Sequence, residues 1–181
     1  MRLVSDESHR DRVRAVQLAL QEAGNVDGWL FYDFRGSDPL SYRVLLLDPA
    51  MHVTRRWYYW IPTEGSPQKL LHRIEPHALD LLPGESHLYV SWAQQREALA
   101  SILKGRRRVV MQYSPMNAVP YVSRVDAGTI ELVESLGVDV ASSGDLIQLF
   151  EAVWTDAQLD SHQYAAVALR RIVDEAFAHV R

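Results

Sequence analysis

The stretch that decides the fold runs from Val109 to Gly137 and reads VVMQYSPMNAVPYVSRVDAGTIELVESLG. It begins with two valines and a methionine, a short apolar run that predicts a buried central strand. Pro115 and Pro120 exclude regular helix or ladder pairing from the middle, because proline lacks an N–H and has a fixed φ. Asp126 is a candidate helix N-cap, and apolar residues then recur at helical spacing up to the glycine. The stretch therefore predicts a strand, a rigid connection and a returning helix, as expected of a scaffold segment in an α/β fold.

Length, charge and composition limit the class of protein. A chain of 181 residues with 48% hydrophobic residues can form one α/β domain with a real core. The net charge of −4 argues against a dedicated nucleic-acid binder, because such domains are usually strongly basic. The sequence contains no cysteine, and no window has the apolar length of a signal peptide core or a membrane span. We therefore expect a soluble cytoplasmic protein without nucleic-acid or membrane partners.

Upstream of the deciding stretch, the apolar pattern predicts a helix over residues 5–23 and a first strand over residues 26–32. Two further strands are expected over residues 42–48 and 53–61, joined as a hairpin. The second of these contains the run WYYW, whose rings alternate between the two faces of a strand. Core packing on both faces explains most of these rings, although part of the aromatic cluster would also suit contact with another chain.

The remaining elements are predicted from apolar spacing and capping residues. They are a short helix over residues 68–74, a strand over 88–90, a helix that starts at Ser91 with Gln94 in a capping box, a strand over 138–141 and a helix that opens at residues 142–145. A final helix is expected over residues 155–181, where Thr155 and Gln158 match a second capping box and an apolar stripe continues without a helix breaker. We interpret this helix as a linker or an oligomer contact; the alternative is a terminal helix packed on its own sheet.

The segment DFRGSDP, residues 33–39, directly follows the first predicted strand. Open α/β sheets place ligand-contacting loops at this end of a strand, so Asp33, Phe34 and Arg35 are candidates for a ligand-binding or active-site rim. A simple turn explains the same residues, because glycine and proline set the backbone and Arg35 can pair with Asp33. The residues alone leave both interpretations open.

No motif in the sequence carries a complete active site. The histidines form no H-E-x-x-H pattern, and there is no G-x-S-x-G elbow, P-loop or G-x-G-x-x-G. The nearest approach to a metal cluster is His72, Glu75 and His77, for which surface histidines in a helix and turn are the stronger explanation. The sequence by itself thus offers neither a catalytic group nor a set of metal ligands.

Several segments together resemble a known family. They are MQYSPMNAVPYVSRVDAGTIELVESLGVDVASSGDLIQLFEAVWT, GWLFYDFRGSDP, HRIEPHALDLLPG, YVSW and the final LDSHQYAAVALRRIVDEAF. In order, they resemble the N-terminal domain of prokaryotic Xaa-Pro dipeptidases and aminopeptidases, members of the creatinase-like, pita-bread metallopeptidase family. The resemblance implies an α/β domain over residues 1–154, with a mixed β-sheet of about six strands flanked by helices and a ribonuclease-H-like motif. It also implies a linker helix over residues 155–181, leading to an absent C-terminal catalytic domain.

The same resemblance implies hydrolase activity only for a longer protein. In the family, two divalent metal ions in the second domain activate a water that hydrolyses the Xaa-Pro bond. None of those ligand motifs stands in this sequence, so no catalytic residue and no metal ligand is expected here, and the chain alone should be inactive.

The family's N-terminal domain helps to form a dimer and restricts substrate access. The implied partners are therefore the chain's own catalytic domain, a second copy of the chain and a peptide substrate. Asp33, Phe34 and Arg35 are the expected substrate-access rim, with Arg35 pairing with a substrate carboxylate or Asp33 with a free amino terminus.

Two other functions stay open at this point. The chain could be a stand-alone peptide- or protein-binding module that reuses the fold without peptidase activity. It could also be a small enzyme that acts through Asp33, Arg35 and a histidine brought close by folding.

Overall fold

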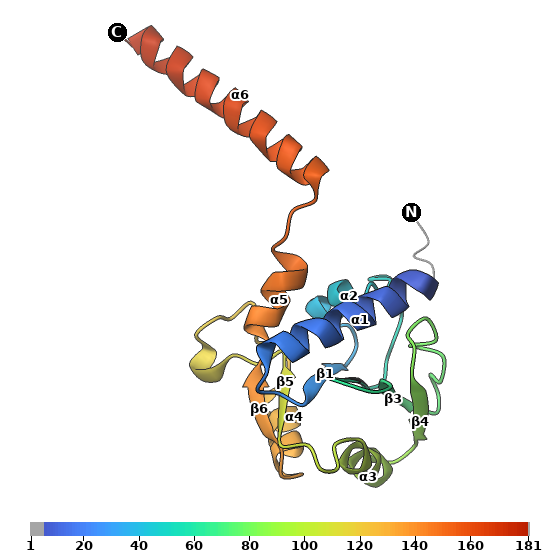
Figure 1. Ribbon diagram of the computed structural model, residues 1–181. Coiled ribbons are helices and arrows are strands. Elements are labelled where there is room, and N and C mark those ends of the chain that lie inside the picture. Colours follow the sequence, from blue (N-terminus) through green and yellow to red (C-terminus); the bar gives the residue numbers. More distant parts are fainter. Residues whose placement is uncertain (1–5, 181) are drawn as a thin grey trace. The chain divides into compact units, whose positions relative to one another are not determined.

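A computed structural model of the chain describes residues 6–180 (Figure 1). The chain divides into two compact units, Met1–Glu151 and Ala152–Arg181. The first unit contains a six-stranded sheet between two layers of helices, and the second contains a single helix. The predicted domain boundary between residues 154 and 155 stays a prediction. The role of the second unit as a linker stays a prediction.

The sheet has the strand order β4-β3-β2-β1-β5-β6. Its strands are β1 (Gly28–Asp33), β2 (Trp57–Pro62), β3 (Gln68–His72), β4 (Glu85–Tyr89), β5 (Arg108–Met111) and β6 (Asp139–Ser142). β2 pairs antiparallel with both of its neighbours, whereas the other three pairings are parallel. All strands except β2 therefore run in the same direction. The expected mixed sheet of about six strands flanked by helices is confirmed.

Helices cover both faces of this sheet, as Figure 1 shows. One face carries α1 (Asp6–Ala23), α2 (Pro39–Val44) and α5 (Gly144–Glu151), whose buried residues share a core with one side of the strands. The other face carries α3 (Trp92–Ile102) and α4 (Ala127–Glu134). The predicted N-caps are confirmed: Ser91 forms a capping box with Gln94, and Asp126 accepts from Thr129 N at the start of α4.

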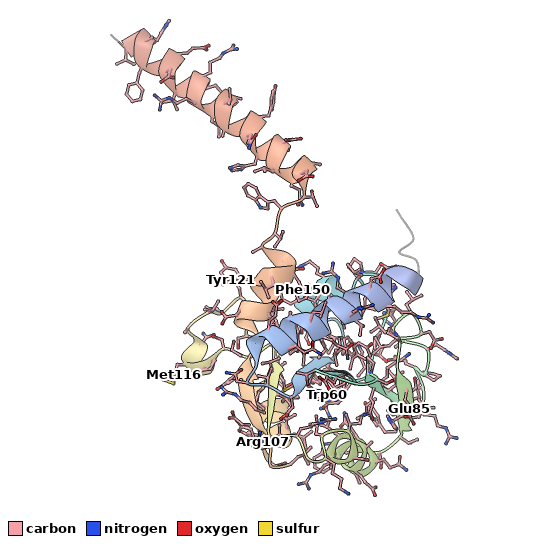
Figure 2. All side chains as sticks on the ribbon, in the orientation of Figure 1. Trp60, Glu85, Arg107, Met116, Tyr121 and Phe150 are labelled. Atoms are coloured by element: carbon pink, nitrogen blue, oxygen red, sulfur yellow. The ribbon has the colours of Figure 1, made fainter. Side chains whose placement is uncertain are left out.

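β2 connects the two cores because its side chains alternate between them. Trp57 and Tyr59 pack with α1, α2 and α5, while Tyr58 and Trp60 pack with α3 and α4. Figure 2 shows Trp60 in the interior of the first unit. All four rings are at most 1% exposed, so the core accounts for them and the expectation that some face another chain is wrong.

Two predicted elements are wrong. The expected strand over residues 42–48 is α2 followed by a turn, because Asp38 caps the helix by accepting from the backbone N–H groups of residues 40 and 41, with Pro39 at the first helical position. The antiparallel partners of β2 are therefore β1 and β3. The expected helix over residues 68–74 is β3, whose backbone pairs with β2 on one side and β4 on the other.

β3 also carries a buried lysine. The Nζ of Lys69 donates to the carbonyl oxygens of Leu79 at 3.1 Å and Leu82 at 2.6 Å, which fixes the irregular segment between β3 and β4 to the sheet. Burial lowers the pKa of Lys69, and the nearby Asp80 carboxylate partly offsets this effect. The other lysine of the chain, Lys104, is exposed.

The second unit contains α6 (Asp156–Val180), which begins at the predicted capping box of Thr155 and Gln158. None of its residues is buried. Its exposed large apolar residues are Leu159, Tyr164, Val167, Leu169, Ile172, Val173, Phe177 and Val180. Within residues 6–180, no helix is long and apolar enough to cross a membrane.

Gly28→Ala should destabilise the first unit by about 2–3 kcal/mol, because an added Cβ would collide with the Ile61 carbonyl oxygen and the Trp60 ring. The control is Gly105→Ala. That glycine has φ +76 but open space around it, so only the cost of the left-handed backbone, about 1 kcal/mol, applies. Urea unfolding measures both, and equal losses would contradict the steric explanation.

Candidate functional site

The candidate site lies at the carboxyl edge of the sheet. Because β1, β3, β4, β5 and β6 run the same way, the loops that follow them meet at one edge, together with the residues that precede β2. Ligands of open α/β sheets bind at this edge. Glu85, the first residue of β4, and Arg107, which directly precedes β5, are labelled in Figure 2 and mark the opposite edge.

Asp33 organises the loop after β1. Its carboxylate is fully buried and accepts hydrogen bonds from Gly36 N at 2.9 Å, Asp38 N at 2.9 Å, Tyr42 Oη at 3.2 Å and Ser37 Oγ at 3.4 Å. Both carboxylate oxygens are therefore occupied by the loop itself. Asp33 therefore has a structural role at this position. Its carboxylate is not exposed, so it is not available for the expected contact with a free amino terminus.

A second buried carboxylate, Asp38, connects this loop to β5. Its Oδ2 accepts from Ser41 Oγ at 2.6 Å, Ser41 Oγ accepts from Gln112 Nε2 at 2.8 Å, and Gln112 Oε1 accepts from Trp29 Nε1 at 3.2 Å. Burial raises the pKa of Asp38 to about 6; hydrogen bonds from Ser41 oppose this rise, and the Asp33 charge adds to it. The chain of contacts fixes the backbone on which the exposed part of the loop is displayed.

Phe34 and Arg35 are the exposed part of the predicted rim. Arg35 has φ +60, a conformation that side chains other than glycine seldom adopt. The predicted Arg35–Asp33 ion pair is absent from the described residues. The Phe34 ring lies 5.7 Å from the guanidinium carbon of Arg56, close enough for a cation–π contact. Contact of Phe34 and Arg35 with a substrate stays a prediction.

A small cavity opens beside Phe34, with a volume of about 190 Å³. Five elements contribute to it: the ends of β1, β3 and β4, the residues before β2 and the first turn of α3. Its lining residues are Phe34, Arg55, Arg56, His72, Tyr89, Trp92 and Gln95. A larger groove of about 650 Å³ lies between α1, β6 and α5, but it contains no buried, unpartnered polar group among the described residues.

The cavity is lined by two cations whose charges are not paired. No carboxylate of the described chain lies within 4.0 Å of the guanidinium nitrogens of Arg55 or Arg56. The carboxylate that acts electrostatically on Arg55 is Glu75, whose oxygens already accept from Thr54 N, Thr54 Oγ1 and Arg55 N. The cavity therefore has a net positive lining.

Gln95 gives the cavity a donor without an acceptor. The residue is 1% exposed, and its Nε2 is buried with no hydrogen-bond partner among the described residues. Leaving such a donor unsatisfied costs about 1–3 kcal/mol. A buried unpaired polar group of this kind needs an explanation, and a bound acceptor is one.

The three residues that come nearest to a metal cluster in the sequence, His72, Glu75 and His77, have other partners in the structure. His72 accepts from Ile74 N at Nδ1, and its Nε2 lies 3.2 Å from the Val90 carbonyl oxygen. Glu75 is occupied by Thr54 and Arg55, and His77 pairs with Asp80. Within the part of the chain that the structure describes, no three His, Asp or Glu side chains could hold a metal ion. These residues therefore do not fit the two metal ions of the resembled family.

Most of the cavity lining was missed from the sequence. Arg55, Arg56, Trp92 and Gln95 stand in no motif, and their common location depends on which strands are neighbours. One signal was present: the pair of arginines directly precedes a buried aromatic strand, so their side chains had to emerge at an edge of the sheet. The histidine expected near Asp33 is not among its hydrogen-bond partners.

Comparison with known proteins gives a match in structure alone. No protein-family model matches the sequence, and no curated protein matches it. The recombinant prolidase from Thermococcus sibiricus matches with a TM-score of 0.64 and 15% identity, over 94% of this chain and 43% of its own. Dipeptidase PepE from Mycobacterium ulcerans matches over the same shares, with a TM-score of 0.60 and 19% identity.

The creatinase/prolidase N-terminal domain of an X-PRO dipeptidase from Streptococcus pyogenes matches over 76% of this chain and 97% of its own, with a TM-score of 0.54 and 12% identity. At these identities the comparisons show the fold, which is that of creatinase/prolidase N-terminal domains. The chain spans only 37% of the prolidase from Pyrococcus horikoshii and 43% of the two enzymes above.

Asp38→Asn should remove a pH dependence from the free energy of unfolding. The folded pKa of about 6 lies above the unfolded value near 3.8, so the stability that neutral Asp38 provides is complete below pH 3.8 and is lost as the pH rises through 6. Between pH 4 and 7 the wild type should therefore lose about 2 kcal/mol relative to the variant. Asp126 has the opposite slope: burial raises its pKa, but hydrogen bonds from Thr129 and Tyr32 together lower it, and both proteins share this effect. Urea unfolding across this range measures the difference, and parallel curves would contradict the assignment.

Gln95→Leu should stabilise the fold by about 1 kcal/mol, because it removes a buried donor that has no partner. Gln112→Leu is the matched control: it leaves Trp29 Nε1 buried without an acceptor, removes the donor to Ser41 Oγ and should cost about 1–3 kcal/mol. Thermal or urea unfolding separates the two variants. A similar loss in both would show that Gln95 has a partner in solution.

Proposed function

We propose that the chain is the non-catalytic N-terminal domain of a metal-dependent Xaa-Pro peptidase of the prolidase or aminopeptidase P type. The observation that carries the proposal is the match to an N-terminal domain of an X-PRO dipeptidase over almost all of that domain's length. The fold alone does not assign an activity, so the proposal also rests on the ordered set of sequence segments that resemble the family.

The domain's role in such an enzyme is to support a dimer and to restrict which peptides reach the catalytic half. Exposed Phe34 and Arg35 at the carboxyl edge of the sheet suit a substrate-access rim. The partners are the chain's own C-terminal catalytic domain, a second copy and the peptide substrate. The two divalent metal ions belong to the catalytic half, and the cytoplasm is the proposed location.

The decisive experiment is to express the complete gene product and assay Xaa-Pro peptides before and after chelation. We expect a product more than about twice the mass of this chain, with cleavage that chelation abolishes and divalent ions restore. The 181-residue chain, assayed in parallel, should cleave nothing. A natural product that ends here and binds peptides without cleaving them would favour the stand-alone binding module instead.

In the complete enzyme, Arg35→Ala should raise KM for peptides with a free carboxyl terminus by roughly tenfold, since a charge-assisted hydrogen bond to the substrate is lost. Arg107→Ala, at the opposite edge of the sheet, is the control and should leave KM unchanged. Steady-state kinetics measure both. If Arg35→Ala leaves KM and kcat as in the wild type, Arg35 is not part of the access rim.

A further inference from the structure

We propose that the cavity lined by Arg55, Arg56 and Gln95 is a binding site for a carboxylate carried on a small apolar group. The inference goes beyond the proposed function, because the site lies wholly within the first unit and needs neither a metal ion nor a second domain.

Charge is the first argument. Arg55 and Arg56 contribute two guanidinium groups to one cavity, and neither is paired with a carboxylate of the described chain. Guanidinium groups bind carboxylates through paired N–H donors. The lining includes no acidic residue; the nearby Glu75 carboxylate acts on Tyr89 and Arg55 from outside it and leaves the two guanidinium charges in excess.

Gln95 supplies the second, independent argument. Its Nε2 donor is buried, lacks a partner and belongs to a residue that lines the cavity. An amide N–H₂ can only donate, so the missing partner must be an acceptor. An anionic oxygen is an acceptor for the amide and for either arginine, whereas a cation would satisfy none of them.

The walls and the volume restrict what is attached to the anion. Phe34, Tyr89 and Trp92 give the cavity aromatic walls, and the Trp92 side chain is substantially exposed at its mouth. A volume of about 190 Å³ corresponds to about six water molecules. That space accepts a carboxylate with one small side chain or ring.

Side chains, not backbone amides, provide the donors. At the start of α3 the Gln94 N–H is occupied by Ser91 Oγ, and the Gln94 side chain accepts from Val90 N and Ser91 N. The nest of free backbone N–H groups that often cradles phosphate is therefore partly closed here. The donors that the cavity offers are therefore the side chains of the two arginines and Gln95.

Titration of the ¹⁵N-labelled 181-residue chain with benzoate tests the site. We expect saturable shifts of the Gln95 side-chain amide and the Trp92 indole signals, with a dissociation constant in the millimolar range. Benzamide has the same shape without the charge and should bind at least roughly tenfold more weakly. Inorganic phosphate is the third probe. Binding of benzamide or phosphate as tight as that of benzoate would overturn the carboxylate assignment.

Variants locate the binding and distinguish its source. Arg56→Gln and Gln95→Leu should each weaken benzoate binding by roughly tenfold, while Arg107→Gln leaves it unchanged. Unchanged binding in both of the first two variants would overturn the proposal. A titration with N-acetylalanine is then compared with the benzoate titration. Tighter binding of N-acetylalanine would identify a peptide carboxyl terminus as the ligand, and tighter binding of benzoate would identify a free aromatic acid. Failure of these titrations would leave metal-dependent cleavage by the complete gene product untouched, so the two proposals fail separately.

Discussion

Burial of β2 on both faces is the constraint on which the rest of the structure depends. Its four large rings are removed from water in both directions, so both faces of the sheet must be covered by helices at this strand. β2 consequently lies inside the sheet between β1 and β3. The adjacent β1 has a glycine opposite the Trp60 ring, where any side chain would collide with it. The residues before β2 then emerge at the carboxyl edge, which places two arginines there.

The sequence predicted the elements that carry their own boundary signals. Caps at Ser91, Asp126 and Thr155 identified three helices. A cap can be recognised from the sequence because the side chain accepts a hydrogen bond from a backbone N–H only a few residues away. Residues 42–48 and 68–74 were assigned wrongly because short apolar runs suit helix or strand equally. The Asp38 cap stabilises a helix at the start of the first segment. Pairing with β2 and β4 stabilises a strand in the second. The latter partners are distant in sequence, so no local pattern reveals them.

The site shows the same division between local and distant causes. Position alone identified the loop after β1, and that loop does lie at the carboxyl edge. The role of Asp33 could not be read from the sequence, because its buried partners include a tyrosine on α2. Likewise, the cavity collects residues from five elements, and only the strand order makes them neighbours. Polar residues that are buried with partners, such as Gln112, and without one, such as Gln95, look identical in the sequence.

The buried Lys69 has a practical consequence for chemical labelling. The sequence contains two lysines, and the Nζ of Lys69 is held beneath the segment that its hydrogen bonds fix. An amine-reactive dye or cross-linker can therefore reach only one lysine side chain in the native fold, that of Lys104 after α3. Lys104 is thus the lysine at which a fluorophore or a surface tether attaches, and modification of Lys69 would report that the segment between β3 and β4 has opened.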